Sequence, residues 1–388
     1  MCPRGPLLVH VHRRYGHPPA ASPDARRRAR IILTVRVDRQ QPRSPLDHRH
    51  IISGDCVAHE PFTAAFHCQT AAAGVLYSTA EASSSLRQDC AMSDASPFRV
   101  WVDGDLIEDA SHAVSAFDRG LMLGDGVFET IRVLGGVAPM ASAHLARLTL
   151  GTERLGLVMP PRLGEHITDA AAAAEQMQTP DAVLRITLTR GDALPGMAGL
   201  SGGASRSIVT LTPRIAVRDE VIDRGLTLIT SQWRWSARSP TAGIKSLDYT
   251  ANVLALREAH SQSVDDALVL NTDDRIVGCT ASNICWFADG TLFTPAAATG
   301  ALAGTTLGLL RSLAPGIGLT VQEADAPIGA LLHADAACAC SSIRGVVPIT
   351  QLDGATIGGQ GRSPRFRALH DAWRAEMARL SGIDFVVD

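Results

Sequence analysis

The sequence predicts a mixed α/β (α+β) fold built as two domains. Patterns typical of strands and of helices both occur after residue 98, but they do not alternate in the regular β-α-β order of a parallel sheet. The composition, 46% apolar and 19% charged over 388 residues, is typical of a globular chain with a sizeable core. A charged segment with little pattern, residues 214–224, separates two patterned blocks. We therefore expect a small N-terminal domain at 98–213 and a larger domain at 222–388.

Residues 1–91 differ in charge from the rest of the chain. They contain 12 arginines and 7 acidic residues, a net charge of +5 (12 − 7), whereas residues 92–388 have 24 basic and 32 acidic residues, a net charge of −8 (24 − 32). No strand or helix period is sustained in this segment, and its first 30 residues loosely fit an Arg-rich transit peptide. Patterned sequence begins at Phe98. We predict that residues 1–91 are a poorly ordered extension, or translated sequence that precedes a start at Met92.

The composition also excludes several classes of protein. No run of about 18 uncharged apolar residues occurs, so we expect no membrane span. The basic first segment carries no aromatic stacking pattern, so we expect no nucleic-acid partner. The eight cysteines have neither the spacing of a zinc site nor that of a disulfide framework. We therefore expect no metal, reduced thiols and a cytoplasmic protein.

The first patterned block combines strands with one helix. Leu145, Leu148 and Leu155 recur at helical spacing and Gly156 follows them, which predicts a helix over 141–155. Gly135-Gly136 is expected to close a hairpin. Runs of β-branched and apolar residues predict strands at 100–104, 127–133, 182–189 and 207–212.

The second patterned block is also mixed. Residues 249–259 are predicted to form a helix with Val253, Leu254 and Leu256 on its apolar side, and 365–380 to form a closing amphipathic helix. A further helix is expected to begin near Gly304. Strands are expected at 226–231, 267–270, 283–287 and 346–349.

Lys245 is the only lysine of the chain, beside 35 arginines. A GC-rich coding sequence explains the absent lysines, because arginine replaces lysine wherever a positive charge alone is needed. Arginine does not lose its proton near neutral pH and cannot form an imine with an aldehyde, whereas lysine can. Lys245 is therefore a candidate Schiff-base lysine.

The motifs around this lysine resemble those of a known family. The sequence resembles the class IV aminotransferases, which are pyridoxal-phosphate enzymes of fold type IV. The resemblance covers residues 98 to about 375 and none of residues 1–91, and the motifs occur in the same order as in the family. The matching motifs are Asp118–Arg132 with His144–Leu148, Lys245–Tyr249 with Asn252–Ala255, Thr280–Asn283, Thr294-Pro295, Gly304–Thr306 and Ser341–Pro348.

The resemblance implies a two-domain fold type IV enzyme with pyridoxal 5'-phosphate as cofactor. It also implies a homodimer, because residues of a neighbouring subunit complete the site in this family. Lys245 matches the catalytic lysine, which holds the cofactor aldehyde as a Schiff base and then moves the α-proton of the substrate.

The resemblance further implies which residues bind the cofactor. Arg147 matches the phosphate-binding arginine, and Thr305, Thr306 and Ser342 match positions whose amides and hydroxyls bind phosphate oxygens at a helix start. An ordinary N-cap explains Thr305 and Thr306 equally well. Tyr249 borders the cofactor ring or belongs to the core. His144 is interpreted as a packed or capping histidine.

The substrate-site candidates are Leu123, Phe128, Arg185 and Arg190. Leu123 stands where the family has a pocket tyrosine, which makes that wall more apolar. The loop 191–197 lacks the arginine and histidine with which D-amino-acid transaminases hold the α-carboxylate. Arg185, on a strand where branched-chain transaminases keep an arginine, and Arg190 remain as carboxylate partners, although either is compatible with a structural role.

The largest departure from the family is Gly278, at the position of the glutamate that pairs with the pyridine nitrogen. Without that carboxylate, we expect slow transamination, or compensation by another acid such as Asp273 or Asp274. The sequence therefore predicts transfer of an amino group between an apolar, branched-chain-like amino acid and a 2-oxo acid. The alternatives are an aminodeoxychorismate lyase, a D-amino-acid aminotransferase and a non-catalytic homologue that binds pyridoxal phosphate.

Overall fold

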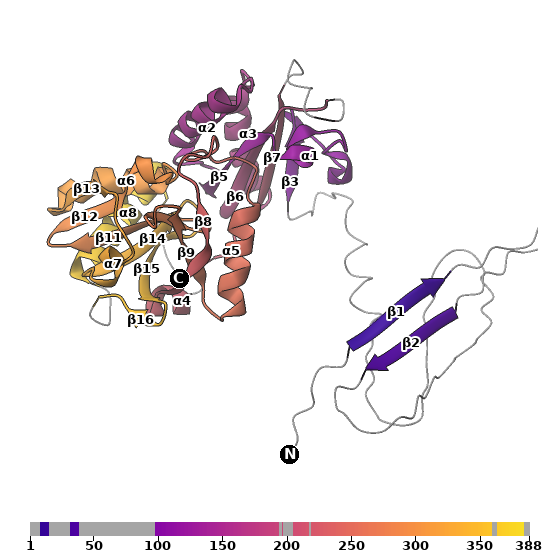
Figure 1. Cartoon of the computed structure of the whole chain (residues 1–388). Helices are drawn as coiled ribbons and strands as arrows, with labels where there is room; N and C mark the ends of the chain where they lie inside the picture. Colours follow the sequence, from indigo (N-terminus) through magenta and orange to yellow (C-terminus); the bar gives the residue numbers. More distant parts are fainter. Residues whose placement is uncertain are drawn as a thin grey trace, which may run out of the picture. The chain divides into compact units, whose positions relative to one another are not determined.

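The computed structural model describes two units of the chain separately. The first unit, Met1–Ser85, contributes one pair of antiparallel strands, β1 (Leu8–Arg14) and β2 (Ile32–Asp38). In the second unit, Leu86–Asp388, the described residues are 98–193, 196, 205–216, 219–358 and 363–383 (Figure 1). Most of the predicted extension at 1–91 thus lies outside the described residues, and the strand pair β1–β2 was not expected from its pattern.

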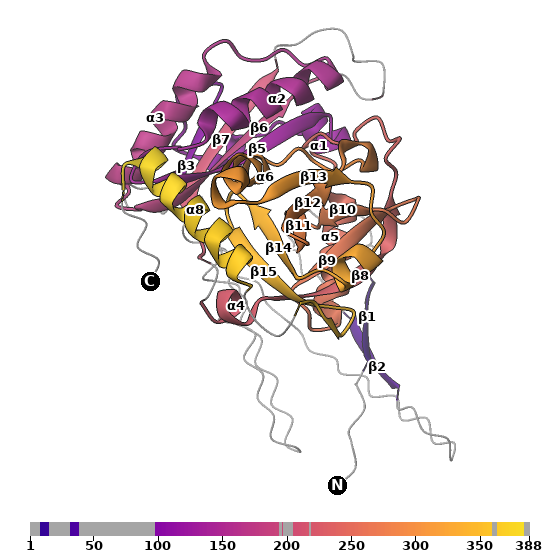
Figure 2. The ribbon, with the colours of Figure 1, turned by 90° about the vertical axis from the view of Figure 1, so that its left-hand side faces the viewer.

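The first sheet of the second unit has five strands and is antiparallel throughout. Their order is β4-β3-β7-β6-β5, so each neighbour pair runs in opposite directions. Figure 2 shows helices α2 and α3 on one face of this sheet, where their apolar side chains and those of the strands form a buried core. The elements are β3 (Arg99–Val102), β4 (Asp105–Leu106), α1 (Arg119–Leu123), β5 (Gly126–Leu134), α2 (Ala141–Leu155), α3 (Leu163–Gln176), β6 (Asp181–Thr189) and β7 (Arg206–Pro213).

The second sheet has nine strands and mixes parallel with antiparallel pairs. Its order is β10-β9-β8-β15-β14-β11-β12-β13, with β16 paired to β15. The pairs β8–β9, β8–β15 and β12–β13 are parallel. The strands are β8 (Leu226–Trp235), β9 (Asp266–Asn271), β10 (Ile276–Cys279), β11 (Asn283–Ala288), β12 (Thr291–Pro295), β13 (Thr320–Ala324), β14 (Ala336–Ser341), β15 (Gly345–Leu352) and β16 (Ala355–Thr356).

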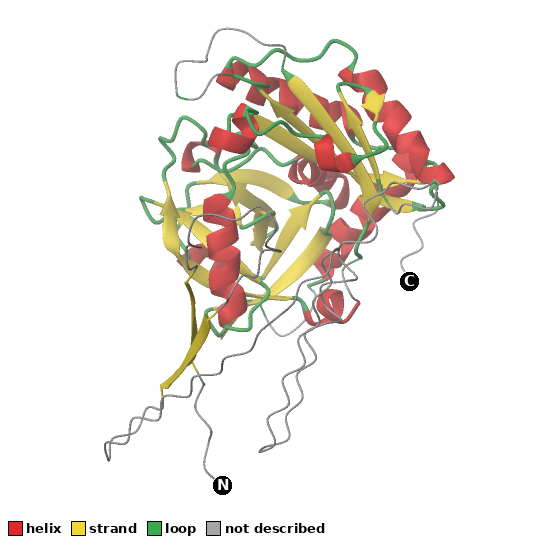
Figure 3. Ribbon diagram, turned by 90° about the vertical axis from the view of Figure 1, so that its right-hand side faces the viewer, coloured by secondary structure: helices red, strands yellow, loops and turns green. Residues whose placement is uncertain are grey.

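Helices cover this large sheet on more than one side. In Figure 2, α8 crosses in front of β14 and β15, and its Phe366, Leu369 and Trp373 side chains are buried with Leu307 and Leu310 of α6. Figure 3 shows the opposite side of the unit. The remaining helices are α4 (Asp219–Arg224), α5 (Thr250–Ser261), α6 (Thr305–Leu313), α7 (Gly329–Leu332) and α8 (Pro364–Ser381).

The predicted mixed α/β class is confirmed, and most predicted elements occur within two or three residues of their expected ends. The segment 214–224 connects β7, of the first sheet, to β8, of the second, and it contains α4. Helix α2 spans the predicted 141–155. The sequence analysis missed the helices α1, α3, α4 and α7 and the strands β4, β10, β12–β14 and β16.

Two local predictions were wrong. Gly135-Gly136 does form a turn, bonded between Leu134 and Val137, but the chain continues into α2 and no second strand follows to make a hairpin. In α5, Ala255 and Ala259 are the buried residues, because small side chains allow the helix close to β8 and β9. Val253, predicted on the buried side, is 54% exposed.

Within the described part of the chain, no helix is both long enough and apolar enough to cross a membrane.

Candidate active site

Lys245 lies in a loop that is bonded to the first residues of β5. The amide of Phe128 donates to the Lys245 carbonyl over 2.9 Å, and the amide of Leu247 donates to the Gly126 carbonyl over 2.9 Å. Only glycine fits at 126, because a Cβ there would lie 2.6 Å from Leu247 Cδ1 and 2.4 Å from the Leu188 carbonyl oxygen. This close approach joins the lysine loop, which follows β8 of the large sheet, to the small sheet.

The amine of Lys245 lies between two aromatic rings. Its Nζ donates to the Tyr249 hydroxyl over 3.1 Å and lies 4.2 Å from the centroid of the Phe128 ring. The two rings meet edge to face at 5.0 Å. Burial, and then the like charges of Arg147 and Arg185, lower the pKa of Lys245 to about 8. The neutral, nucleophilic amine is therefore far more populated near neutral pH than in an ordinary lysine.

Glu129 is a fully buried carboxylate held by the guanidinium of Arg147 and the imidazole of His144. Arg147 donates to it through Nε over 2.7 Å and through Nη2 over 2.6 Å, and Nδ1 of His144 lies 2.6 Å from Oε2. Burial raises the pKa of Glu129, but the bonds from Arg147 and His144 outweigh burial and lower it below the usual value. The charge stays on Glu129 and fixes the guanidinium of Arg147.

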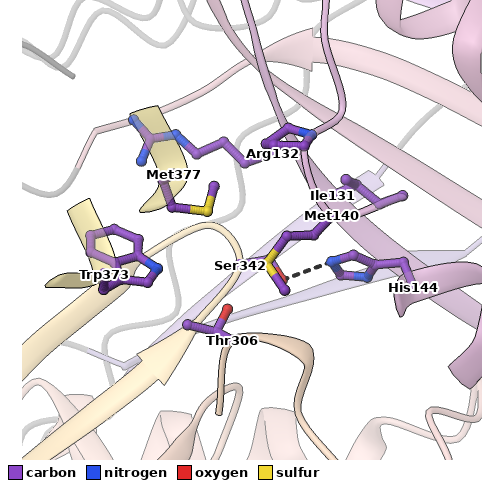
Figure 4. A pocket seen from close by; sticks show the side chains of 9 residues that line it. Ile131, Arg132, Met140, His144, Thr306, Ser342, Trp373 and Met377 are labelled. Atoms are coloured by element: carbon purple, nitrogen blue, oxygen red, sulfur yellow. Dashed lines mark hydrogen bonds between the residues drawn. The ribbon is translucent and has the colours of Figure 1, made fainter. Parts of the chain in front are cut away.

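Two further polar side chains, Thr305 at the start of α6 and Ser342, converge on His144. His144 Nε2 lies 3.2 Å from Thr305 Oγ1 and 3.1 Å from Ser342 Oγ, and the two hydroxyl oxygens are 3.2 Å apart. Figure 4 shows His144 and Ser342 facing each other, with Thr306 beside them. The small cavity in that view is lined by Ile131, Arg132, Pro139, Met140, His144, Thr306, Ser342, Trp373 and Met377.

The start of α6 can receive an anion. No side chain caps the helix, and its first amides point out of it. Gly304, the residue before the helix, approaches Asn283 so closely that a Cβ would lie 1.7 Å from Asn283 Oδ1. Arg147 also uses Nη1 to donate to the Ala303 carbonyl over 3.0 Å. Three of its five N–H groups are thus engaged, and one on each Nη atom remains for a ligand.

Arg185 of β6 faces the same aromatic ring as the lysine. Its guanidinium carbon lies 3.9 Å from the centroid of Phe128, and it has no carboxylate partner among the described residues. Burial lowers the pKa of Arg185. Two half-buried cations, Arg185 and Lys245, therefore meet at Phe128, and neither forms an ion pair with an acid among the described residues, which favours an anionic ligand.

The remaining substrate candidates are Arg190 and Leu123. Arg190 binds both oxygens of Asp125 over 2.8 and 3.0 Å and donates to the carbonyls of Leu155 and Gly156, so its donors serve the structure of the small sheet. Of the two roles left open for Arg190, this arrangement supports the structural one. Leu123 ends α1 with an exposed side chain.

Gly278 lies on β10 at the position where the family has a glutamate, and glycine has no carboxylate. Asp274 is 73% exposed in the turn after β9 and binds Arg234, and Asp273 belongs to the same turn. The turn lies four residues from Gly278, about 13 Å along an extended strand.

Asp266, a buried acid beside the strand of Gly278, already accepts hydrogen bonds on both carboxylate oxygens. It accepts from the Thr280 amide and hydroxyl over 3.2 and 2.6 Å and from Arg344 over 2.8 Å. Within the described residues, Asp266 is thus committed to joining the turn at Thr280 to the turn that carries Ser342 and Arg344.

Comparison with known proteins identifies the family. The model of the family described as amino-transferase class IV matches residues 126–352, more than half of the chain. The chain belongs to the class IV aminotransferases. It is therefore a pyridoxal-phosphate-dependent enzyme of this family, and solved structures of similar fold hold pyridoxal phosphate or its amine form.

Several class IV proteins are similar over most of their length. A D-alanine aminotransferase of Listeria innocua is 30% identical over 292 residues, 73% of this chain and 98% of its own. A putative branched-chain-amino-acid aminotransferase of Methanocaldococcus jannaschii is 28% identical over 68% of this chain and 90% of its own. The structure of 4-amino-4-deoxychorismate lyase from Pseudomonas aeruginosa has a TM-score of 0.64 and 31% identity, covering 71% of this chain and 98% of its own.

The residues present fit pyridoxal phosphate. Lys245 offers an amine of lowered pKa for the aldehyde, and the free N–H groups of Arg147, the first amides of α6 and the hydroxyls of Thr305 and Ser342 suit a phosphate dianion. In this class IV aminotransferase the predicted cofactor residues therefore converge, from four separate segments of the chain.

The sequence analysis missed Glu129 and read His144 as a packed or capping residue. A signal for both was present. Glu129 stands in a strand whose other residues, apart from Arg132, are apolar, β-branched or glycine, and a buried acid needs a cationic partner. His144 and Arg147 are three apart on a helix and so share a face.

The lowered pKa of Lys245 predicts an unusual pH dependence of cofactor capture. The rate at which the cofactor-free chain forms its imine with pyridoxal phosphate should rise with pH and level off above about 8, because the neutral amine is the nucleophile. A simple alkylamine under the same conditions should level off above about 10. The measurement is the growth of imine absorbance from pH 6 to 11. A midpoint for the chain near that of the alkylamine would contradict the lowered pKa.

The missing carboxylate at Gly278 is tested by restoring it. In Gly278→Glu, a carboxylate near the pyridine nitrogen should raise the pH at which the bound cofactor's absorbance changes and increase turnover. The new Cβ would lie 3.1 Å from the Ser282 carbonyl oxygen, so this turn must shift by a few tenths of an ångström. Gly278→Gln has the same size without the charge. Equal spectra and turnover for the two variants would exclude an electronic role for position 278.

Proposed function

We propose that this class IV aminotransferase moves an amino group between an apolar, branched-chain-like amino acid and a 2-oxo acid through Lys245. The observation that carries the proposal is the meeting of Lys245 and Arg185 at the Phe128 ring, with no acid partner for Arg185 among the described residues. An amino acid or 2-oxo acid brings the carboxylate that such a pair of cations lacks. The apolar ring between them suits a substrate without a charged side chain.

Each residue has a separate task in this proposal. Pyridoxal phosphate, when bound, supplies the electron sink for bond breaking at the substrate Cα. Lys245 would hold the cofactor through its aldehyde and would carry the proton from the substrate Cα. Arg147, Thr305, Thr306 and Ser342 hold the phosphate, and Tyr249, bonded to the lysine amine, orients it.

Arg185 favours the branched-chain type over the D-amino-acid type. It lies on a central strand of the small sheet with its guanidinium free, whereas the loop 191–197 contributes neither an arginine nor a histidine. The similarity to D-alanine aminotransferases makes D-alanine the competing substrate.

A second candidate function is that of an aminodeoxychorismate lyase, which releases pyruvate on the same cofactor. The observation in its favour is the 31% identity to the Pseudomonas lyase structure over nearly all of that chain. A carboxylate-binding Arg185 suits this substrate too, so the geometry of one chain does not by itself exclude it.

A substrate panel separates these functions. We expect purified enzyme to transfer the amino group of L-leucine to 2-oxoglutarate, Lys245→Ala to abolish it, and Arg185→Leu to raise KM for the amino acid about 10- to 100-fold through loss of a charge-assisted bond. Arg154→Leu, at an exposed arginine of α2, is the matched control. Turnover of D-alanine alone would replace the proposal by D-amino-acid transamination, and 4-aminobenzoate formed from 4-amino-4-deoxychorismate would establish the lyase.

We further propose a homodimer, supported by exposed apolar side chains next to the site. Leu121 is 66% exposed on α1, near Phe117, Met122 and Leu123, which are exposed as well. This group lies close to the lysine loop, since a Cβ on Gly124 would lie 3.5 Å from the Asp248 amide. Contact with a second copy removes this surface from water and brings Leu123 to the neighbouring site.

The dimer is tested by placing a charge on this surface. Leu121→Glu should convert a dimer into monomers in sedimentation experiments, because the interface would bury an unpaired carboxylate. Leu150→Glu, at an equally exposed leucine of α2, should leave the dimer intact. A wild-type chain that sediments as a monomer contradicts the proposal.

A cytoplasmic location remains our proposal as well. The cysteines that the structure describes, Cys279, Cys285, Cys338 and Cys340, are buried free thiols, which suits a reducing compartment.

A further inference from the structure

His144 connects the two halves of the proposed phosphate site. One ring nitrogen faces Glu129, which holds Arg147, and the other faces the hydroxyls of Thr305 and Ser342. The imidazole is almost fully buried, so it cannot exchange these partners for water. Figure 4 shows the ring edge directed at Ser342.

The partner on one side decides the role of the nitrogen on the other. Glu129 is an ionised carboxylate and only accepts hydrogen bonds, so Nδ1 of His144 must carry the proton. Burial lowers the pKa of His144, which favours the neutral ring. In a neutral ring with a protonated Nδ1, Nε2 carries a lone pair and accepts.

Hydrogen-bond counting then limits what the two hydroxyls can do. Thr305 and Ser342 have one hydroxyl proton each. Nε2 takes one of them, at 3.2 or 3.1 Å. The other proton is left for the second hydroxyl oxygen, 3.2 Å away, or for a ligand at the start of α6.

We propose that His144 is a positioning residue that orients the hydroxyl protons of Thr305 and Ser342, so that one hydroxyl donates to the ring and the other donates to the cofactor phosphate. The orientation originates at Glu129 and is transmitted through the imidazole. The same carboxylate orients the guanidinium of Arg147. One buried charge therefore sets both the cationic and the hydroxyl donors of the phosphate site.

This inference rests on the proposed roles of Arg147, Thr305 and Ser342. It predicts different effects for the two amide substitutions His144→Asn and His144→Gln. In His144→Asn, the side-chain amide reaches the place of Nδ1 and still donates to Glu129, but nothing occupies the place of Nε2. In His144→Gln, the amide oxygen reaches the place of Nε2 and accepts from a hydroxyl, while Glu129 keeps the two bonds from Arg147.

The experiment measures dissociation constants of the full-length chain for pyridoxal phosphate and for pyridoxal, which forms the same imine but lacks the phosphate. We expect His144→Asn to weaken pyridoxal phosphate about 10- to 100-fold, as for loss of an oriented bond to a charged group, and to leave pyridoxal unchanged. His144→Gln should lose no more than a few fold. His260→Asn, at an exposed histidine of α5, is the control.

A double-mutant cycle gives an independent readout. Ser342→Ala should cost less affinity for pyridoxal phosphate in the His144→Asn background than in the wild type, because the hydroxyl is no longer oriented there. Additive effects of the two substitutions would argue against the relay.

The remaining outcomes overturn the inference in distinct ways. If His144→Gln lost more affinity for pyridoxal phosphate than His144→Asn, the contact of His144 with Glu129 and Arg147 would explain the effect. If both variants lost affinity for pyridoxal to the same extent, His144 would have only a packing role. Unchanged affinity in His144→Asn also rejects the inference, while the proposed function stands. A wild-type chain that fails to bind pyridoxal phosphate rejects the proposed function instead.

Discussion

The structure around the site depends on one buried carboxylate. Glu129 has no exposed surface, and taking an ion out of water costs several kcal/mol unless partners replace the water. Arg147 and His144 supply those partners at 2.6–2.7 Å. Because both lie on α2, while Glu129 belongs to β5, the helix cannot shift on its sheet without exposing the charge. From α2 the contacts continue to Ala303 and Thr305, at the start of α6 in the large sheet's part of the chain.

Asp266 plays a comparable role on the other side of the site. It is as fully buried as Glu129 and is balanced by Arg344 and by the amide and hydroxyl of Thr280. Its bonds hold together two turns that are far apart in the sequence. The proposed phosphate site is thus built from short turns and helix ends. These segments are held in place because each is hydrogen-bonded to a buried acid.

The charges left over explain why the site suits anionic ligands. Arg147 keeps two N–H groups that Glu129 and Ala303 do not use, and Lys245 and Arg185 face Phe128 without an ion-pair partner among the described residues. The lowered pKa of Lys245 is the measurable consequence of this excess, because burial and like charge both disfavour the protonated amine. A phosphate and a carboxylate would relieve it.

The family, the mixed fold class and the cofactor were predictable from the sequence, since they rest on motif order and on a single lysine where arginine cannot serve. Helix α2 was predictable to the residue, because its leucines recur regularly and a glycine ends it. The pairing of Glu129 with His144 and Arg147 was not, because it joins a strand to a helix 15 to 18 residues away and depends on how the two pack.

Sequence reasoning failed where packing overrides pattern. Val253 has the spacing of a core residue but is exposed, because the helix approaches its sheet through the small Ala255 and Ala259. Arg185 and Arg190 could not be told apart from the sequence, because Arg185 lies on β6 and Arg190 directly follows that strand. Only the tertiary structure shows that Arg190 pairs with Asp125, whereas Arg185 has no acid partner among the described residues. The assembled sheet decides this, because it sets the direction of each side chain and the neighbours that the side chain contacts.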